Sequence, residues 1–309
     1  MLLGVIMEVR LSSGSEAKLG LRHMRTDANT NTIYLMTRGI CQADCAFCAQ
    51  GRFREMSRLA RIDWNVWELD RILPLLANEK RACIQCLNYP EIYEDLLEMV
   101  KKVECPVSVS AQPFSLEQMR NLKPHVDRIS ISLDCATPRL FYKYKPFYNW
   151  KLHWTRIRKA VEIFGKNKVV SHLIVGLGET EREMVEAMTA LKNAGVVPSL
   201  FAFTPVKGTP MQEWKQPDIG TYRRLQIARH LLMKDTVSYN DITYSKDRIV
   251  SFGCDVEDVV TTDVFRTQGC PNCNRPYYNE RPGSMLYNYP FKIPNREIDH
   301  LLRQAAIVY

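Results

Sequence analysis

The sequence predicts an α/β fold built on a parallel sheet. Over residues 32–234, short apolar or β-branched runs alternate with amphipathic stretches or with loops that lead into them. This alternation is typical of parallel strands joined by helical crossovers. Two of the predicted helices begin with capping-box spacing, at Ser115 and at Thr180. The six predicted strands are residues 32–36, 82–87, 107–110, 129–133, 169–175 and 199–203.

The pattern changes on either side of this region. Residues 1–31 end in a polar run and predict an irregular N-terminal extension. After the six βα units of residues 32–234, strand-like pieces at 241–244 and 249–253 precede a stretch rich in Pro, Gly, Asn and Arg. We interpret residues 235–309 as a separate C-terminal lobe. A chain of 309 residues, 46% hydrophobic and 25% charged, has room for one catalytic domain and such a lobe.

Cysteine content and charge indicate the compartment and the kind of partner. Ten cysteines without a secretory signal favour metal ligation in a reducing cytoplasm over disulfides. The apolar residues 1–7 are too short for a signal peptide, and no run is long enough to span a membrane. We therefore expect a cytoplasmic protein without a membrane partner. The net charge of +8 suits an acidic protein or a nucleic acid and does not decide between them.

Three cysteines follow the first predicted strand on one short loop. Cys41 and Cys45 are separated by three residues, and Cys45 and Cys48 by two. Three thiolates can bind three irons of a cubane cluster and leave the fourth open, whereas a pure electron carrier normally supplies four cysteines. The spacing therefore predicts an iron–sulfur cluster with one iron available for chemistry. A zinc knuckle or three unrelated core thiols are the alternatives, although structural zinc sites favour paired hooks with a nearby fourth ligand.

This run, with the aromatic Phe47 directly before its last cysteine, resembles the signature of the radical S-adenosylmethionine (radical SAM) enzymes. The resemblance implies a partial (β/α)6 TIM barrel, a [4Fe-4S] cluster, and S-adenosylmethionine chelated to the open iron. An electron from the cluster then yields a 5′-deoxyadenosyl radical. In a barrel, a loop that follows a strand lies at the carboxyl end of the sheet, where active sites are built.

Several segments at predicted strand ends match what biotin synthase-like members of this family use to hold S-adenosylmethionine. The turn with Ile174 and Gly176 looks like the adenine-contacting turn, because glycine lets the backbone approach a flat ring closely. Asp134 falls where the family places a carboxylate on the ribose hydroxyls. Phe47 is the aromatic expected beside the cluster. The remaining residues assigned to the cofactor by this resemblance are Cys86, Leu87, Asn88 and Ser132.

The thiols of Cys83 and Cys86 form a CxxC pair, but residues three apart on a strand face opposite sides, so we predict core thiols there. A second metal-binding group is predicted from Cys254, Cys270 and Cys273 in the turn-rich C-terminal lobe. A structural zinc hook around Cys270 and Cys273 is the alternative.

Residues 267–290 resemble the C-terminal signature of the two-protein, archaeal-type lipoyl synthases. Segments at 112–114, 133–138, 172–180 and 203–210 resemble barrel segments of the same family. The resemblance implies a sulfurtransferase that inserts sulfur into a protein-bound octanoyl chain. The sulfur donor is a second [4Fe-4S] cluster. Its protein ligands are Cys254, Cys270 and Cys273 with a fourth group from Ser284, Arg275 or Arg281.

The implied partners are an octanoylated lipoyl-carrier protein or its peptide, a second lipoyl synthase component, and an electron donor such as ferredoxin or flavodoxin. Carrier domains of this kind are generally acidic, which suits the net charge, and no nucleic acid is expected.

Two other classes compete with this interpretation. Another radical SAM activity is the first, either a biotin synthase-like reaction or methylthiolation of RNA. Biotin synthase carries auxiliary cysteines on barrel strands, but only Cys83 matches here, and Val170 occupies the aligned fifth-strand position. Single-chain lipoyl synthases place their auxiliary cysteines before the radical SAM motif, and no cysteine precedes Cys41. A zinc-bearing nucleic-acid-binding protein is the second class, and it does not explain the pattern predicted for the adenine pocket.

Overall fold

Six parallel strands form the central part of the structure, a computed structural model that describes residues 6–281 and 283–306. Each overlaps one of the six predicted strands. They belong to a nine-stranded sheet of order β11-β10-β9-β8-β7-β2-β1-β6-β5, curled into a partial barrel. The predicted barrel of six βα units is therefore confirmed. The parallel strands are β2 (Ile33–Thr37), β7 (Ala82–Gln85), β8 (Val107–Ser110), β9 (Arg128–Ser130), β10 (Val169–Val175) and β11 (Val196–Ala202).

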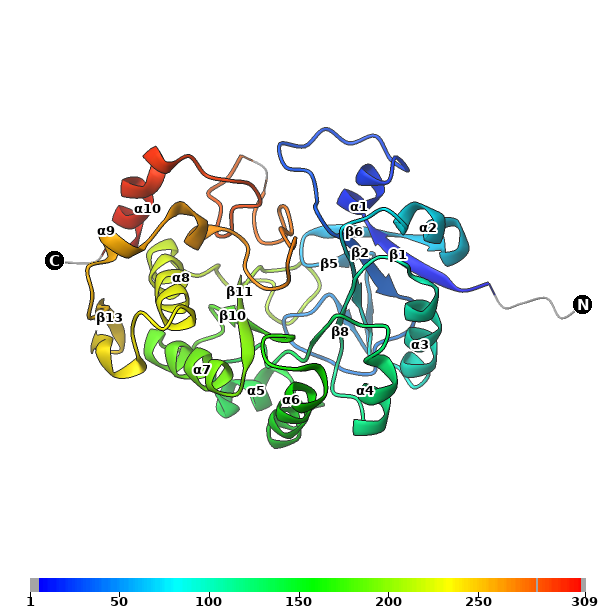
Figure 1. The fold of residues 1–309 in the computed structure, drawn as a ribbon, viewed down its shortest axis with the longest axis horizontal. Helices are drawn as coiled ribbons and strands as arrows, with labels where there is room; N and C mark the ends of the chain where they lie inside the picture. Colours follow the sequence, from blue (N-terminus) through cyan, green and yellow to red (C-terminus); the bar gives the residue numbers. More distant parts are fainter. Residues whose placement is uncertain (1–5, 282, 307–309) are drawn as a thin grey trace, which may run out of the picture.

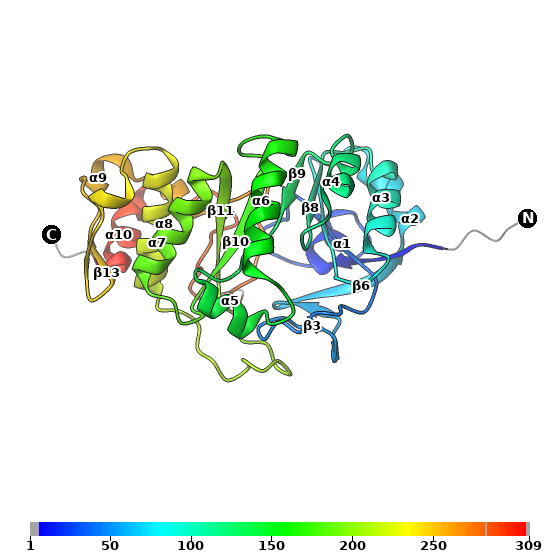
Figure 2. The same cartoon turned by 90° about the horizontal axis from the view of Figure 1, so that it is seen from below.

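Helices cover the outer face of the sheet, and Figure 2 shows α3, α4, α6 and α7 in a row in front of the strands. Both predicted capping boxes are present, at the starts of α4 and α7. No described helix is long and apolar enough to cross a membrane. The α-helices of the barrel region are α2 (Leu69–Leu76), α3 (Ile92–Lys102), α4 (Leu116–Leu122), α5 (Pro138–Tyr144), α6 (Trp150–Phe164), α7 (Glu181–Asn193) and α8 (Ile219–Met233).

The N-terminal region differs from the prediction. Residues 1–31 were expected to be irregular, but they contain β1 (Glu8–Ser12) and α1 (Ser13–Lys18). Strand β1 pairs antiparallel with β2 on one side and with β6 (Ile62–Glu68) on the other. A bare edge of β2 would expose unpaired backbone groups, and this pairing satisfies them. The sheet continues to β5 (Arg58–Leu59), while β3 (Gln50–Gly51) and β4 (Arg54–Glu55) form a small hairpin.

The C-terminal region packs against the barrel and shares its hydrophobic core. The two predicted strand-like pieces form a hairpin of β12 (Thr243–Ser245) and β13 (Arg248–Ser251). The short helix η1 (Tyr239–Asp241) precedes the hairpin, and α10 (Ile298–Ala305) packs on α8. Three more short helices follow the hairpin: α9 (Val256–Val259), η2 (Thr262–Phe265) and η3 (Asn295–Glu297). The domain boundaries drawn from the sequence remain predictions.

The segment that carries Cys270 and Cys273 bridges the open side of the partial barrel (Figure 1, orange). At one edge, Thr32 just before β2 donates a hydrogen bond to the Asn272 carbonyl at 3.0 Å. At the other edge, Ser199 on β11 donates to the Gln268 carbonyl at 2.6 Å. The first and last parallel strands are thus joined through this segment, which closes one side of the barrel interior.

Candidate active site

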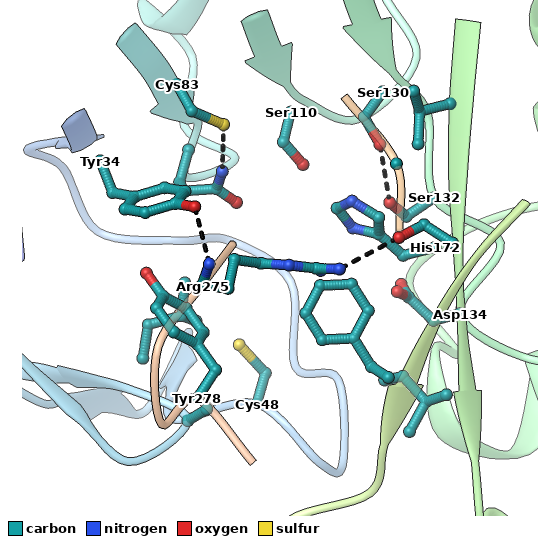
Figure 3. Close-up of a pocket in the computed structure, with 18 of the residues that line it drawn as sticks. Tyr34, Cys48, Cys83, Ser110, Ser130, Ser132, Asp134, His172, Arg275 and Tyr278 are labelled. Carbon is teal, nitrogen blue, oxygen red and sulfur yellow. Dashed lines mark hydrogen bonds between the residues drawn. The ribbon is translucent and has the colours of Figure 1, made fainter. Parts of the chain in front are cut away.

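A deep cavity lies inside the curled sheet, and strand side chains form its wall (Figure 3). Side chains two residues apart on a strand face it together, as Cys83 with Gln85 on β7 and Ser108 with Ser110 on β8 do. The cavity is lined by thiols from the loop after β2, from β7 and its end, and from the C-terminal segment. Parts of the chain that are far apart in sequence therefore meet here.

The cysteine loop after β2 is fixed by hydrogen bonds to its backbone. The Cys48 amide donates to the Cys45 carbonyl at 3.0 Å and closes a tight turn. The Arg54 guanidinium donates to the carbonyls of Cys45 and Cys48 at 3.0 and 3.2 Å. At the start of the loop, a Cβ on Gly39 would lie 2.5 Å from the Tyr89 ring, so that position requires glycine. The loop is thus held in one shape by the protein alone.

The three thiols of this loop suit an iron–sulfur cluster. Cys41, Cys45 and Cys48 are all partly exposed and line the cavity. Burial raises the pKa of Cys45, and it raises the pKa of Cys48 to about 12, so both are protonated without a metal. Bound iron stabilises the thiolate form. Within residues 6–281 and 283–306, no three His, Cys, Asp or Glu side chains converge on a single-ion site; a cluster instead places its thiolates on different irons.

Asp134, predicted to bind ribose, lies in the cavity wall beside a lysine that sequence reasoning missed. Its carboxylate accepts a hydrogen bond from the Lys145 ammonium at 2.8 Å. Lys145 is completely buried, also donates to the Ser132 carbonyl at 2.8 Å, and lies over the rings of Phe141 and Tyr148. This lysine fixes one carboxylate oxygen of Asp134 and leaves the other available to a ligand. In the sequence, Lys145 has no pattern that separates it from surface lysines.

The turn after β10 contains a glycine in a left-handed conformation. Gly176 has a φ of +104°, and a Cβ there would approach Pro217 at 3.1 Å and Phe203 at 3.3 Å. The Glu179 carboxylate accepts hydrogen bonds from the amides of Gly176 and Leu177 at 2.7 and 2.9 Å. Ile174 lines the cavity, whereas Gly176, also predicted to contact the cofactor, is not among the lining residues. The turn therefore presents Ile174 to the cavity and is braced by Glu179, whose role the sequence did not indicate.

Other residues assigned to S-adenosylmethionine from the sequence also line the cavity. The end of the second parallel strand is tied to the cysteine loop, because the Gln42 amide donates to the Asn88 carbonyl at 2.7 Å. Leu87 is fixed in turn by its amide, which donates to Thr37 Oγ1 at 2.9 Å. The lining residues of this set are Phe47, Cys86, Leu87, Asn88 and Ser132.

The structure brings two of the three cysteines predicted for the second metal-binding group to the cavity. Cys270 and Cys273 line the cavity, but Cys254 does not. Cys254 lies beside Asp255; burial raises its pKa, and so does that carboxylate. Cys83 was expected to be a core thiol, but it faces the cavity. Burial raises the pKa of Cys83, and the nearby thiols of Cys270 and Cys273 raise it further.

Of the three candidates for a fourth ligand, only Arg275 lines the cavity. Its guanidinium lies over the Phe201 ring at 3.6 Å and donates to Ser199 Oγ at 3.1 Å. In Figure 3 it lies between Cys83 and Cys48. Ser284 is exposed and donates to the carbonyl of Arg281, which is also exposed.

A half-buried histidine, His172 on β10, faces the same space and packs against Phe201 with ring centroids 4.8 Å apart. Burial lowers the pKa of His172 to about 3, and the nearby cations Arg275 and Lys145 lower it further in the same direction. The imidazole is therefore neutral and can accept or donate a hydrogen bond inside the cavity.

Comparison with known proteins identifies the class. Residues 36–191, just over half of the chain, match the family model of the radical SAM superfamily. The chain therefore belongs to the radical SAM superfamily and is a radical SAM enzyme. This family implies a [4Fe-4S] cluster and S-adenosylmethionine, and the loop of Cys41, Cys45 and Cys48 lies inside the matched region.

Two curated relatives and one solved structure refine this assignment. The chain is 26% identical over 192 residues to tRNA-2-methylthio-N(6)-dimethylallyladenosine synthase of Protochlamydia amoebophila, covering 58% of this chain and 41% of that protein. It is 23% identical over 196 residues to lipoyl synthase of Corynebacterium aurimucosum, covering 58% of this chain and 51% of that one. The chain thus spans about half the length of these relatives or less.

The solved structure of methylornithine synthase matches with a TM-score of 0.51 and 14% identity, over 63% of this chain and 59% of that chain. At this identity the likeness concerns the fold alone, and it agrees with the partial barrel described above.

Proposed function

We propose that the protein inserts sulfur into an octanoyl chain attached to a carrier protein, as one component of a two-protein lipoyl synthase system. The observation that carries this proposal is that two separate groups of thiols face one cavity. One group suits the cluster that generates a radical. The other suits an auxiliary cluster that donates sulfur.

The cavity between the thiol groups suits an alkyl chain. Apolar side chains of Met36, Val170 and Phe201 line it, and burial of apolar surface favours binding of an acyl chain. An unactivated C–H bond resists acid–base attack, so the reaction needs a cofactor-derived radical, with the protein controlling position and access of water. The net charge of +8 is compatible with an acidic carrier protein.

In the proposed reaction, a C–H bond of the octanoyl chain is replaced by a C–S bond. One electron from a donor such as ferredoxin or flavodoxin cleaves S-adenosylmethionine into methionine and a 5′-deoxyadenosyl radical. This radical removes a hydrogen atom from the chain and leaves as 5′-deoxyadenosine. An auxiliary cluster held by the second group of thiols would supply the sulfur that bonds to the carbon radical and would take up the remaining electron. The residues of this chain bind and orient both reactants.

The test begins with anaerobic reconstitution using iron and heavy-isotope sulfide. We expect about eight irons per chain, the content of two [4Fe-4S] clusters. The protein is then supplied with S-adenosylmethionine, a reductant, the second component and an octanoyl-lysine carrier peptide. We expect 5′-deoxyadenosine and a peptide that carries the heavy sulfur. The same peptide with unmodified lysine is the control.

An octanoyl peptide that gains no sulfur, while 5′-deoxyadenosine forms normally, would reject the proposal. Methylthiolation is the rival activity, and the relative from P. amoebophila is the reason to test it. Incorporation of heavy sulfur into a tRNA adenosine, with none in the peptide, would assign that activity instead.

A further inference from the structure

A row of three side chains near the amino ends of neighbouring strands faces the cavity. Tyr34 on β2, Cys83 on β7 and Ser108 on β8 are direct partners in the parallel register, and all three line the cavity. Neighbouring strands lie about 4.8 Å apart. Cys83 therefore lies midway along this row, roughly one strand spacing from each of the other two residues.

The two cysteines of the C-terminal segment lie at the two ends of this row. The Cys273 sulfur is 3.4 Å from the Tyr34 hydroxyl oxygen. Cys270 lies beside Ser108, whose side chain forms a hydrogen bond with the Cys270 thiol. Cys83 is thus flanked by Cys270 on one side and by Cys273 on the other.

Contacts outside the thiols hold this arrangement in place. The Cys273 amide donates to the Cys270 carbonyl at 3.1 Å, and Asn272 between them has a φ of +64°. Asn274 donates through Nδ2 to the Asn29 carbonyl at 2.8 Å and to the Pro290 carbonyl at 3.1 Å. The turn is therefore fixed to the barrel without a metal.

The surrounding charges distinguish Cys83 from Cys254. A cluster bound by thiolates adds negative charge, which nearby cations stabilise. Arg275 lies near Cys83, and Arg81 donates a hydrogen bond to Ser108 Oγ at 2.8 Å beside Cys270. Cys254 lies beside the carboxylate of Asp255 and outside the cavity lining. The environment therefore favours a cluster at Cys83.

We propose that Cys83, Cys270 and Cys273 bind the auxiliary iron–sulfur cluster, with Cys83 in the role predicted for Cys254. This inference rests on the proposed sulfur-insertion function and names the ligands of its sulfur donor. Arg275 faces the same space and would supply positive charge beside the cluster.

The experiment isolates the auxiliary site by iron content. In the full chain, alanine replaces Cys41, Cys45 and Cys48 together, which leaves the auxiliary site as the place where a cluster can form. After anaerobic reconstitution we expect about four irons per chain. Adding Cys83→Ala should reduce this below about one iron, and adding Cys254→Ala should leave it unchanged. Cys83→Ser, which keeps the size of the side chain, guards against a folding defect, and far-ultraviolet circular dichroism checks the fold.

Each outcome has a defined meaning. Loss of iron in Cys83→Ala and Cys83→Ser, with Cys254→Ala unchanged, supports the inference. Loss of iron in Cys254→Ala, or full iron in both Cys83 variants, overturns it and leaves the proposed function intact. Absence of iron from the parent protein that lacks only Cys41, Cys45 and Cys48 would overturn the auxiliary cluster and the proposed function with it. Stoichiometric zinc in place of iron would do the same.

Discussion

The two groups of thiols that face the cavity differ in how the chain brings them together. Cys41, Cys45 and Cys48 lie on one loop and are positioned by hydrogen bonds within that loop and from Arg54. Cys83 lies on β7, whereas Cys270 and Cys273 arrive from the far end of the sequence. The first group depends on local spacing, and the second depends on the register of the sheet.

The surroundings of the two groups differ as well. The cysteine loop lies at the carboxyl end of the sheet, with the Asp134–Lys145 pair and the glycine turn of Gly176. The second group lies toward the amino ends of β2, β7 and β8. One end of the cavity therefore carries the residues predicted to hold S-adenosylmethionine, and the other end carries Cys83, Cys270 and Cys273. This division predicts that changes at one end leave the other end intact.

The largest effect is expected from Cys45→Ala. Removing one of only three thiolates should abolish reductive cleavage of S-adenosylmethionine and leave about four irons per chain at the second group. The measurement is 5′-deoxyadenosine formed under dithionite, together with iron content. Cys105→Ala, which removes a buried thiol outside the cavity, is the matched control and should behave like wild type. Undiminished 5′-deoxyadenosine in the Cys45 variant would remove this loop from radical generation.

A smaller effect is expected from Asp134→Ala. Hydrogen bonds to a charged acceptor are worth about 1.5–3 kcal/mol, so S-adenosylmethionine should bind roughly tenfold more weakly or worse. The variant also leaves the buried Lys145 without its partner, which lowers stability. The double variant Lys145→Met, Asp134→Asn removes both charges, so it is the control for the stability that Asp134→Ala loses by leaving Lys145 unpaired. Equilibrium binding and iron content are measured; equal affinity in wild type and Asp134→Ala would make Asp134 purely structural.

The smallest effect concerns pH and the glycine turn. Burial raises the pKa of Glu179 from near 4.5 to about 6, against the opposing hydrogen bonds from Gly176 and Leu177. The folded state binds this proton more tightly than the unfolded state. The proton on Glu179 therefore adds about 2 kcal/mol to the free energy of unfolding. This contribution is complete below pH 4.5 and is lost as the pH rises through 6. Glu179→Gln should flatten that part of the stability profile of the metal-free protein in denaturant unfolding. An identical profile in both proteins would contradict the prediction.

Much of the fold could be predicted from sequence because its signals are local. Alternating βα patterns and two capping boxes located the six parallel strands and the starts of α4 and α7. Strand β1 was missed because its partners, β2 and β6, are known only once the sheet is assembled. A short strand that alternates charged and apolar residues can pair with any strand whose edge has unpaired backbone groups, so its partner cannot be read from its own sequence.

Residues of the candidate site also differ in whether local sequence signals could predict them. The spacing of Cys41, Cys45 and Cys48 predicted one group, and the end of a predicted strand located Asp134 beside the cavity. The position of Cys83 in the cavity wall could be known only from the sheet register, which places it between Tyr34 and Ser108. No sequence spacing relates Cys83 to Cys270, so Cys254 was the nearer choice along the chain.

The claim that the two thiol groups have different tasks is tested most directly with Cys273→Ala. With the second component and an octanoylated carrier peptide present, one reaction is assayed both for 5′-deoxyadenosine and, by mass spectrometry, for thiolated peptide. We expect this variant to keep one cluster, to form 5′-deoxyadenosine, and to yield no thiolated product. Sulfur insertion at the wild-type level would contradict the account and return Cys270 and Cys273 to a structural role.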